Sequence, residues 1–140
     1  MTTAIDIAAN LARVAEQMAA AAARAGRPAS DITLVAVSKT HPVAMIHQAL
    51  AAGQADFGEN LVEEAWAKFV DPANPAAIGN CAPEAARLHL IGPIQSRKAA
   101  LAVACRPALI HAVDRLKIAN RLERYAAEAG LAAVDVLLEV

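Results

Sequence analysis

The sequence has few aromatic residues and almost no net charge, and each shortage excludes a class of protein. Phe, Trp and Tyr together make up 3% of the 140 residues, and the 13 Lys and Arg nearly balance the 14 Asp and Glu. A nucleic-acid-binding surface needs basic residues gathered on one face, often with aromatic side chains between them. We therefore expect no nucleic-acid partner.

Cysteines and long hydrophobic runs are also scarce. Cys81 and Cys105 have neither CxxC spacing nor a histidine cluster beside them, so we interpret them as free thiols in a reducing cytoplasm and predict no metal site. No apolar run reaches the roughly 20 residues that span a bilayer, and the first residues lack the basic region of a secretory signal. A cytoplasmic protein without membrane contact is expected.

What the sequence does have is a repeated alternation of short β-branched runs with amphipathic stretches. Hydrophobic residues make up 57% of the chain, which is enough for one compact core. The runs predict five strands, over residues 31–39, 55–60 (a short strand with its turn), 87–92, 108–113 and 133–140. The amphipathic stretches predict helices over residues 3–25, 42–53, 61–70, 94–105 and 114–130.

Local signals within these helices predict their starts and their buried sides. Pro42 is expected at the first position of its helix, with one of the two preceding residues as cap. Asn60 is a candidate cap for the next helix. In that helix, the spacing of Leu61, Ala65 and Phe69 predicts the side that faces the core.

Strict alternation of strands and helices indicates parallel strands joined by right-handed crossovers. Two α/β architectures fit: an open doubly wound sheet and a TIM-type (β/α)₈ barrel. Neither GxGxxG nor GxxxxGK[ST] follows the first strand, so the strongest nucleotide-binding signatures of the open sheet are missing. A barrel needs eight strands and about 250 residues. We therefore expect residues 1–140 to be the N-terminal five-strand portion of a single barrel domain.

Polar residues follow the predicted strands, where parallel α/β proteins build their sites. The first strand ends in "SKT", which contains Lys39, and the second in "GEN", which contains Glu59 and Asn60. A lysine in a barrel mouth is partly desolvated, which favours a neutral amine able to form an imine with an aldehyde. Alternatively, Lys39 extends into water or pairs with Glu59. His89 and His111 lie within strands, and we interpret them as hydrogen-bonded core histidines.

Four motifs, "LVAVSKTHP", "FGEN", "LHLIGPIQSRK" and "HAVDR", follow one another at fitting separations. Together they resemble the pyridoxal phosphate homeostasis proteins, which are relatives of the N-terminal barrel of alanine racemase. The resemblance covers residues 32–140 and implies a barrel that holds pyridoxal 5′-phosphate (PLP) at the carboxyl mouth of its strands. It also implies that Lys39 forms the internal aldimine and that Asn60 lies beside the cofactor.

The resemblance further implies a protein of vitamin B6 homeostasis that carries the cofactor, with no catalytic residue. Racemase relatives use a tyrosine from a second domain, whereas Tyr125 lies within a predicted helix. The alternatives are an amino-acid racemase or decarboxylase of this fold, a Schiff-base aldolase on another barrel, and an inactive fragment. The family's phosphate cradle belongs to the last third of the barrel, beyond these 140 residues. A monomer is expected for the full-length protein, and self-association through open sheet edges for a fragment.

Overall fold

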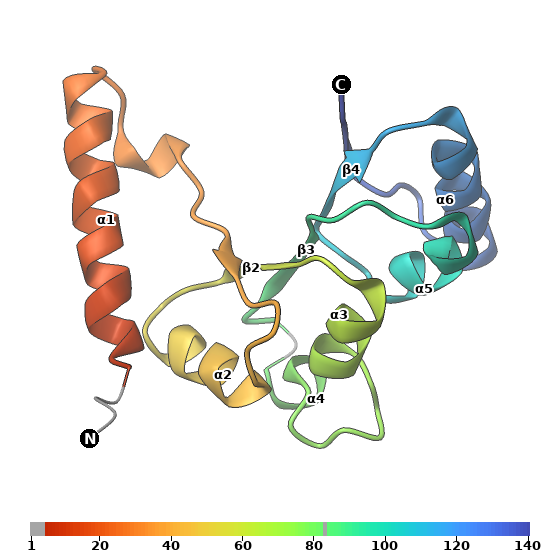
Figure 1. The fold of residues 1–140 in the computed structure, drawn as a ribbon, viewed down its shortest axis with the longest axis horizontal. Coiled ribbons are helices and arrows are strands. Elements are labelled where there is room, and N and C mark those ends of the chain that lie inside the picture. Colours follow the sequence, from red (N-terminus) through yellow and green to blue (C-terminus); the bar gives the residue numbers. More distant parts are fainter. Residues whose placement is uncertain (1–4, 83) are drawn as a thin grey trace.

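Five parallel strands form one sheet in the computed structural model, which describes residues 5–82 and 84–140 (Figure 1). The strands are β1 (Ala36–Val37), β2 (Asp56–Glu59), β3 (Arg87–Leu90), β4 (Leu109–Val113) and β5 (Val136–Leu138). They lie in the order β1-β2-β3-β4-β5, and each pairing is parallel. This sequential order differs from a doubly wound sheet, whose strand order reverses at a switch point. The predicted parallel α/β sheet is confirmed.

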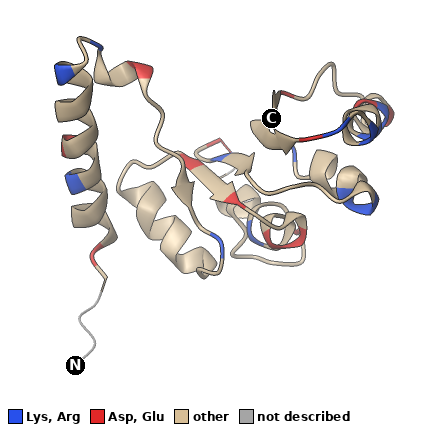
Figure 2. Cartoon of the chain, turned by 45° about the horizontal axis from the view of Figure 1, so that its top comes forward, with Lys and Arg blue, Asp and Glu red and all other residues tan. Residues whose placement is uncertain are grey.

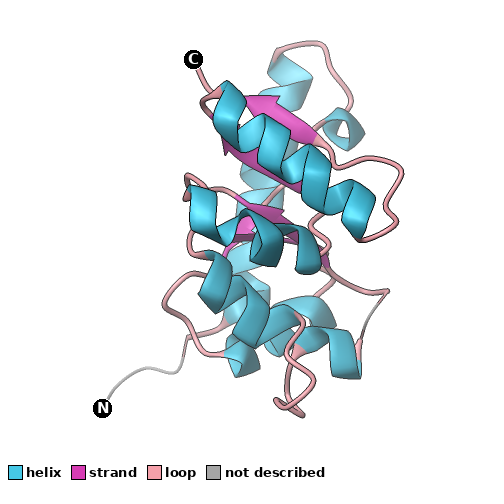
Figure 3. Cartoon of the chain, turned by 90° about the vertical axis from the view of Figure 1, so that its right-hand side faces the viewer, coloured by secondary structure: helices cyan, strands magenta, loops and turns pink. Residues whose placement is uncertain are grey.

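Helices connect the strands and also precede the sheet. They are α1 (Ile7–Arg24), α2 (Val43–Ala51), α3 (Val62–Phe69), α4 (Ile78–Cys81), α5 (Ala99–Ala104) and α6 (Leu116–Glu128), with 3-10 turns at Ala29–Asp31 and Ser96–Lys98. Helix α1 stands at the β1 end of the molecule, where it contacts α2 (Figure 1). Figure 3, viewed from the side of α6, shows helices stacked in front of the strands. None of the described helices combines the length and hydrophobicity needed to cross a membrane.

The hydrophobic core lies between the sheet and the helices that connect its strands. Alternate strand residues point into it, and Phe57, Leu90 and Ile110 are each at most 1% exposed. The helices contribute mainly aliphatic side chains and alanines: Ile46, Ala49, Val62, Ala65, Ala102, Val103, Ile118 and Leu122. Phe57 also packs on Phe69 of α3, with ring centroids 6.2 Å apart. This packing fixes α3 close to the end of β2, where the candidate site begins.

The structure differs from the prediction in where several strands and helices begin or end, and in which residues of α3 are buried. Strand β1 pairs only over Ala36–Val37, much shorter than the predicted run of residues 31–39. Pro42 is the N-cap of α2 instead of its first residue, and no side chain caps that helix. Leu61 is the N-cap of α3 and is 61% exposed, so it does not belong to the buried side predicted for it. Asn60 is therefore not the helix cap. Residues 3 and 4 of the predicted leading helix lie outside the described residues.

Candidate functional site

The two residues predicted to bind the cofactor follow two neighbouring strands, at the carboxyl edge of the sheet. Lys39 comes two residues after the end of β1, and Asn60 directly follows β2. β1 and β2 pair in parallel with Val37 opposite Gly58, so both residues follow paired strand ends, and the chain then turns at Lys39, where the His41 N–H donates to the Ser38 carbonyl oxygen at 3.1 Å. Asn60 is half-buried, whereas Lys39 is exposed instead of partly desolvated as the sequence predicted. An exposed amine at this edge is accessible to a small-molecule aldehyde.

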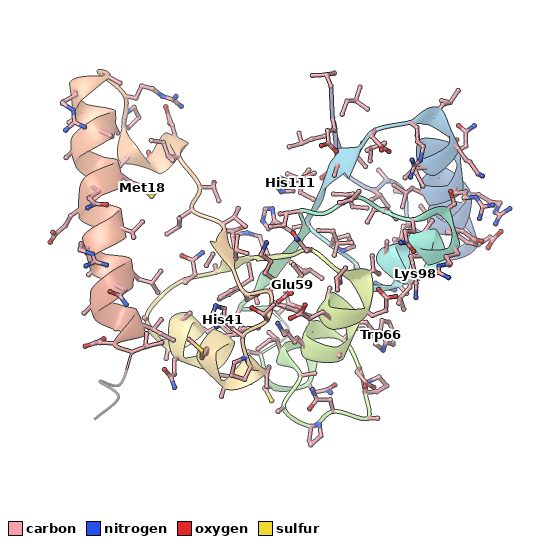
Figure 4. All side chains as sticks on the ribbon, in the orientation of Figure 1. Met18, His41, Glu59, Trp66, Lys98 and His111 are labelled. Atoms are coloured by element: carbon pink, nitrogen blue, oxygen red, sulfur yellow. The ribbon has the colours of Figure 1, made fainter. Side chains whose placement is uncertain are left out.

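Beside these two residues, the last residue of β2 is a buried carboxylate. Glu59 is 0% exposed and lies close to α3 (Figure 4), and Figure 2 shows acidic positions in red among the strands of the sheet. Its Oε1 accepts a hydrogen bond from the Ser38 hydroxyl at 2.7 Å and from Lys68 Nζ at 2.9 Å. An unpaired buried charge is costly, so Lys68 serves to balance Glu59. The predicted alternative in which Glu59 pairs with Lys39 is wrong.

Lys68 reaches this carboxylate from α3 and connects it to a second one. Its Nζ also donates to Glu64 Oε1 at 2.6 Å, one helical turn earlier. This hydrogen bond holds the pKa of Glu64 below its ordinary value, against the opposing effect of burial. Neither Lys68 nor Glu64 was predicted to have a role, although their spacing of four residues on a helix is a usable signal for an ion pair.

The loops after β2 and β3 meet at a glycine. A Cβ at Gly92 would overlap the backbone carbonyl oxygen of Asn60, so only glycine fits at this position. The close approach holds the backbone of Asn60 from the β3 side, just as pairing with β1 holds β2 from the other. The backbone of Asn60 is therefore positioned by main-chain packing against Gly92.

A separate polar cluster lies across β2, β3 and β4. Asp56 Oδ1 accepts a hydrogen bond from Arg87 Nε at 2.8 Å and lies 2.8 Å from His89 Nε2, whose Nδ1 is 3.0 Å from His111 Nε2. The bond from Arg87, with a smaller contribution from His89, holds the pKa of Asp56 below its ordinary value. His89 is buried, which confirms its interpretation as a hydrogen-bonded core histidine. No group of three or more His, Cys, Asp or Glu residues in the described part of the chain is arranged to hold a metal ion.

Comparison with known proteins gives a consistent set of relatives, although no family model matches the chain. The pyridoxal phosphate homeostasis protein of Escherichia coli K12 is 42% identical over 135 residues, which cover 96% of this chain and 54% of the relative. The pyridoxal phosphate homeostasis protein of Pseudomonas aeruginosa is 42% identical over 134 residues, with the same coverage of 96% and 54%. The chain thus spans about half the length of these curated relatives.

Comparison with solved structures points to the same group of relatives. PipY of Synechococcus elongatus PCC7942, solved with PLP bound, is 40% identical and superposes with a TM-score of 0.68 over 89% of this chain and 50% of PipY. A protein of unknown function from Bifidobacterium adolescentis is 35% identical, with a TM-score of 0.80 over 96% of this chain and 54% of that protein. The resemblance predicted from the four sequence motifs is therefore confirmed, and the chain is homologous to about half of a pyridoxal phosphate homeostasis protein.

Proposed function

We propose that this protein binds PLP and takes part in intracellular PLP homeostasis, with Lys39 as the point of covalent attachment and Asn60 beside the cofactor. The observation that carries the proposal is that this amine and this amide follow the ends of two paired parallel strands, at the same edge of the sheet. Similarity to proteins named for PLP homeostasis, and to a structure solved with PLP, supports it.

The residues at this edge fit the reactive end of the cofactor. PLP, when bound, supplies an aldehyde conjugated to an electron-withdrawing ring. The Nζ of Lys39 would attack the aldehyde carbon, and the carbonyl oxygen would leave as water, so attachment needs neither an oxidant nor a reductant. The Asn60 amide can donate and accept hydrogen bonds at the neighbouring strand end. Lys39 thus holds the ligand, and Asn60 orients it.

We infer that the five strands form the N-terminal part of a single (β/α)₈ barrel domain. Their sequential parallel order is the one a barrel requires. Apolar side chains on the two outermost strands, Val37 on β1 and Val136 and Leu138 on β5, are between 38% and 74% exposed. Closure of a barrel would cover such side chains, and the relatives are about twice as long as this chain.

The protein is proposed to hold the cofactor without turning over a substrate. Tyr125, the single tyrosine of the sequence, lies near the carboxyl end of α6, where it packs under the Arg124 guanidinium at 4.4 Å. Because a helix that follows a parallel strand runs back along it, this end of α6 lies toward the opposite edge of the sheet from Lys39. Tyr125 is therefore poorly placed to exchange protons at the cofactor. The cytoplasmic location and the lack of a nucleic-acid partner stay predictions.

Absorption spectroscopy during titration with PLP tests the proposal. The wild type should develop a visible band, Lys39→Ala should not, and Lys117→Ala, which removes an exposed lysine of α6, should behave like the wild type. Assays of racemisation and decarboxylation with PLP and a panel of amino acids should show no turnover. Turnover that depends on Lys39 would favour the enzyme alternative, and absence of a band in the wild type would contradict PLP binding by this chain.

A further inference from the structure

We propose that Glu64 and Lys68 of α3 are positioning residues, which hold the backbone on both sides of Lys39 so that its amine is presented at the carboxyl edge beside Asn60. The inference rests on the proposed attachment of PLP to Lys39. It assigns a function to two charged side chains that do not themselves lie at the end of a strand.

The residue before Lys39, Ser38, makes four hydrogen bonds, one of which closes a turn from the His41 N–H to the Ser38 carbonyl oxygen at 3.1 Å. The Ser38 N–H donates to the Gly58 carbonyl oxygen at 3.0 Å, which continues the pairing of β1 with β2. The Ser38 hydroxyl donates to Glu59 Oε1 at 2.7 Å, and the Ser38 carbonyl oxygen accepts from Lys68 Nζ at 2.7 Å. Ser38 is buried, so these bonds are largely shielded from water.

The residue after Lys39 is held from the same helix. The Thr40 N–H donates to Glu64 Oε1 at 2.6 Å. Thr40 has a φ of 64°, a left-handed conformation that is unfavourable for a β-branched residue and persists only where neighbouring contacts enforce it. The bond to Glu64 is such a contact. Lys39 therefore lies between two residues that α3 holds, one by Lys68 and the other by Glu64.

The charges of this cluster indicate which substitution tests the inference. Glu59 is fully buried, and its Oε2 has no hydrogen-bond partner among the described residues, so removing Lys68 would leave a buried carboxylate uncompensated and disturb folding. Glu64 is different, because its side chain is 23% exposed and the Lys68–Glu59 pair survives without it. Replacing Glu64 releases Thr40 without unbalancing the core.

Three substitutions of α3 give a matched set. Glu64→Ala removes the acceptor for the Thr40 N–H. Glu64→Gln keeps a side-chain oxygen that can accept this hydrogen bond, so it should hold Thr40 nearly as well as the wild type does. Glu63→Ala is the control, because Glu63 precedes Glu64 in the same helical turn but pairs with Lys98 instead of Thr40. Thermal unfolding of each variant shows that the chain is folded.

Two readouts are needed, one without the cofactor and one with it. Amide hydrogen exchange in the PLP-free protein should be at least about tenfold faster at Thr40 in Glu64→Ala than in the wild type, with no change in Glu63→Ala. Labelling at limiting PLP, trapped with borohydride and quantified at Lys39 relative to Lys117, should fall about fivefold or more in Glu64→Ala. Glu64→Gln should lie close to the wild type in both.

The outcomes separate this inference from the proposed function. If Glu64→Ala loosens Thr40 yet labels Lys39 as well as the wild type, or leaves Thr40 exchange unchanged, the positioning role is wrong while PLP attachment stands. If Glu64→Gln fails to rescue either readout, the hydrogen bond to Thr40 is not what matters, and the inference is again overturned. If the wild type takes no label at Lys39, the proposed function fails and the positioning role fails with it.

Discussion

His89 Nδ1 and His111 Nε2 lie 3.0 Å apart on the neighbouring strands β3 and β4. On its other side, His89 Nε2 lies 2.8 Å from Asp56 Oδ1. Since the ionised Asp56 can only accept, neutral His89 donates through Nε2 and accepts from His111 through Nδ1. The two rings therefore have a fixed tautomer when both are neutral, and protonation of both rings would place two cations in contact.

This arrangement predicts that stability falls on mild acidification. Burial, together with the neighbouring His89, lowers the pKa of His111 from its ordinary value of about 6.5. The unfolded chain then binds more protons than the folded one, so His111 contributes stability above about pH 6.5 that is lost as the pH falls below it. Urea unfolding should give a lower free energy at about pH 5.5 than at about pH 8, and this difference should shrink in His111→Asn. The same difference in the variant and the wild type would show that other groups cause it.

The contact between Gly92 and Asn60 predicts unequal effects of two glycine substitutions. Gly92→Ala should destabilise the protein by several kcal/mol, because its Cβ would overlap rigid backbone at Asn60. Gly58→Ala should cost less, since its Cβ would meet only the side-chain ends of Ile91 and Val35, at 3.1 to 3.3 Å. Thermal unfolding of both variants compares them. A Gly92→Ala protein as stable as Gly58→Ala would mean that the two loops do not approach as described.

The two cysteines should differ sharply in reactivity. Cys81 is exposed, whereas Cys105 is buried, and burial raises the pKa of its thiol to about 12. Because the thiolate is the reactive form, an alkylating reagent near neutral pH should modify Cys81 alone in the folded chain and both thiols after unfolding. Mass spectrometry counts the modified sites, and Cys81→Ala should be unreactive until unfolded. Rapid alkylation of Cys105 in the folded protein would contradict its burial in the core.

The order of elements could be predicted because apolar runs and Gly or Pro breaks are local signals. The ends of the strands and helices could not be predicted, because they depend on pairing with neighbouring elements. Strand β1, for example, is limited to Ala36–Val37 by its contact with β2. The buried side of α3 was predicted one residue out of register at its start, because Leu61 and Val62 are both apolar and only packing shows that Val62 faces the core. Helix α4 lies in a Pro- and Asn-rich stretch between the predicted helix at residues 61–70 and the predicted strand at residues 87–92, where no helix was expected.

The site could be predicted only in part for the same reason. Lys39 and Asn60 are placed by strand ends, which the sequence indicates, and the parallel pairing of β1 with β2 puts both residues at the same edge of the sheet. The role of Lys68 depends on how closely α3 approaches the ends of β1 and β2, and no local pattern encodes that approach. The exposure of Lys39 was one of the alternatives that the sequence left open, because it depends on what covers the sheet.

Reductive trapping followed by peptide mapping tests the central claim most directly. The sequence contains four lysines, Lys39, Lys68, Lys98 and Lys117, so the site of a PLP label fixed by borohydride can be read without ambiguity. We predict that at limiting PLP the label lies predominantly on Lys39. A label spread evenly over the exposed lysines, or concentrated on any other one, would contradict the account.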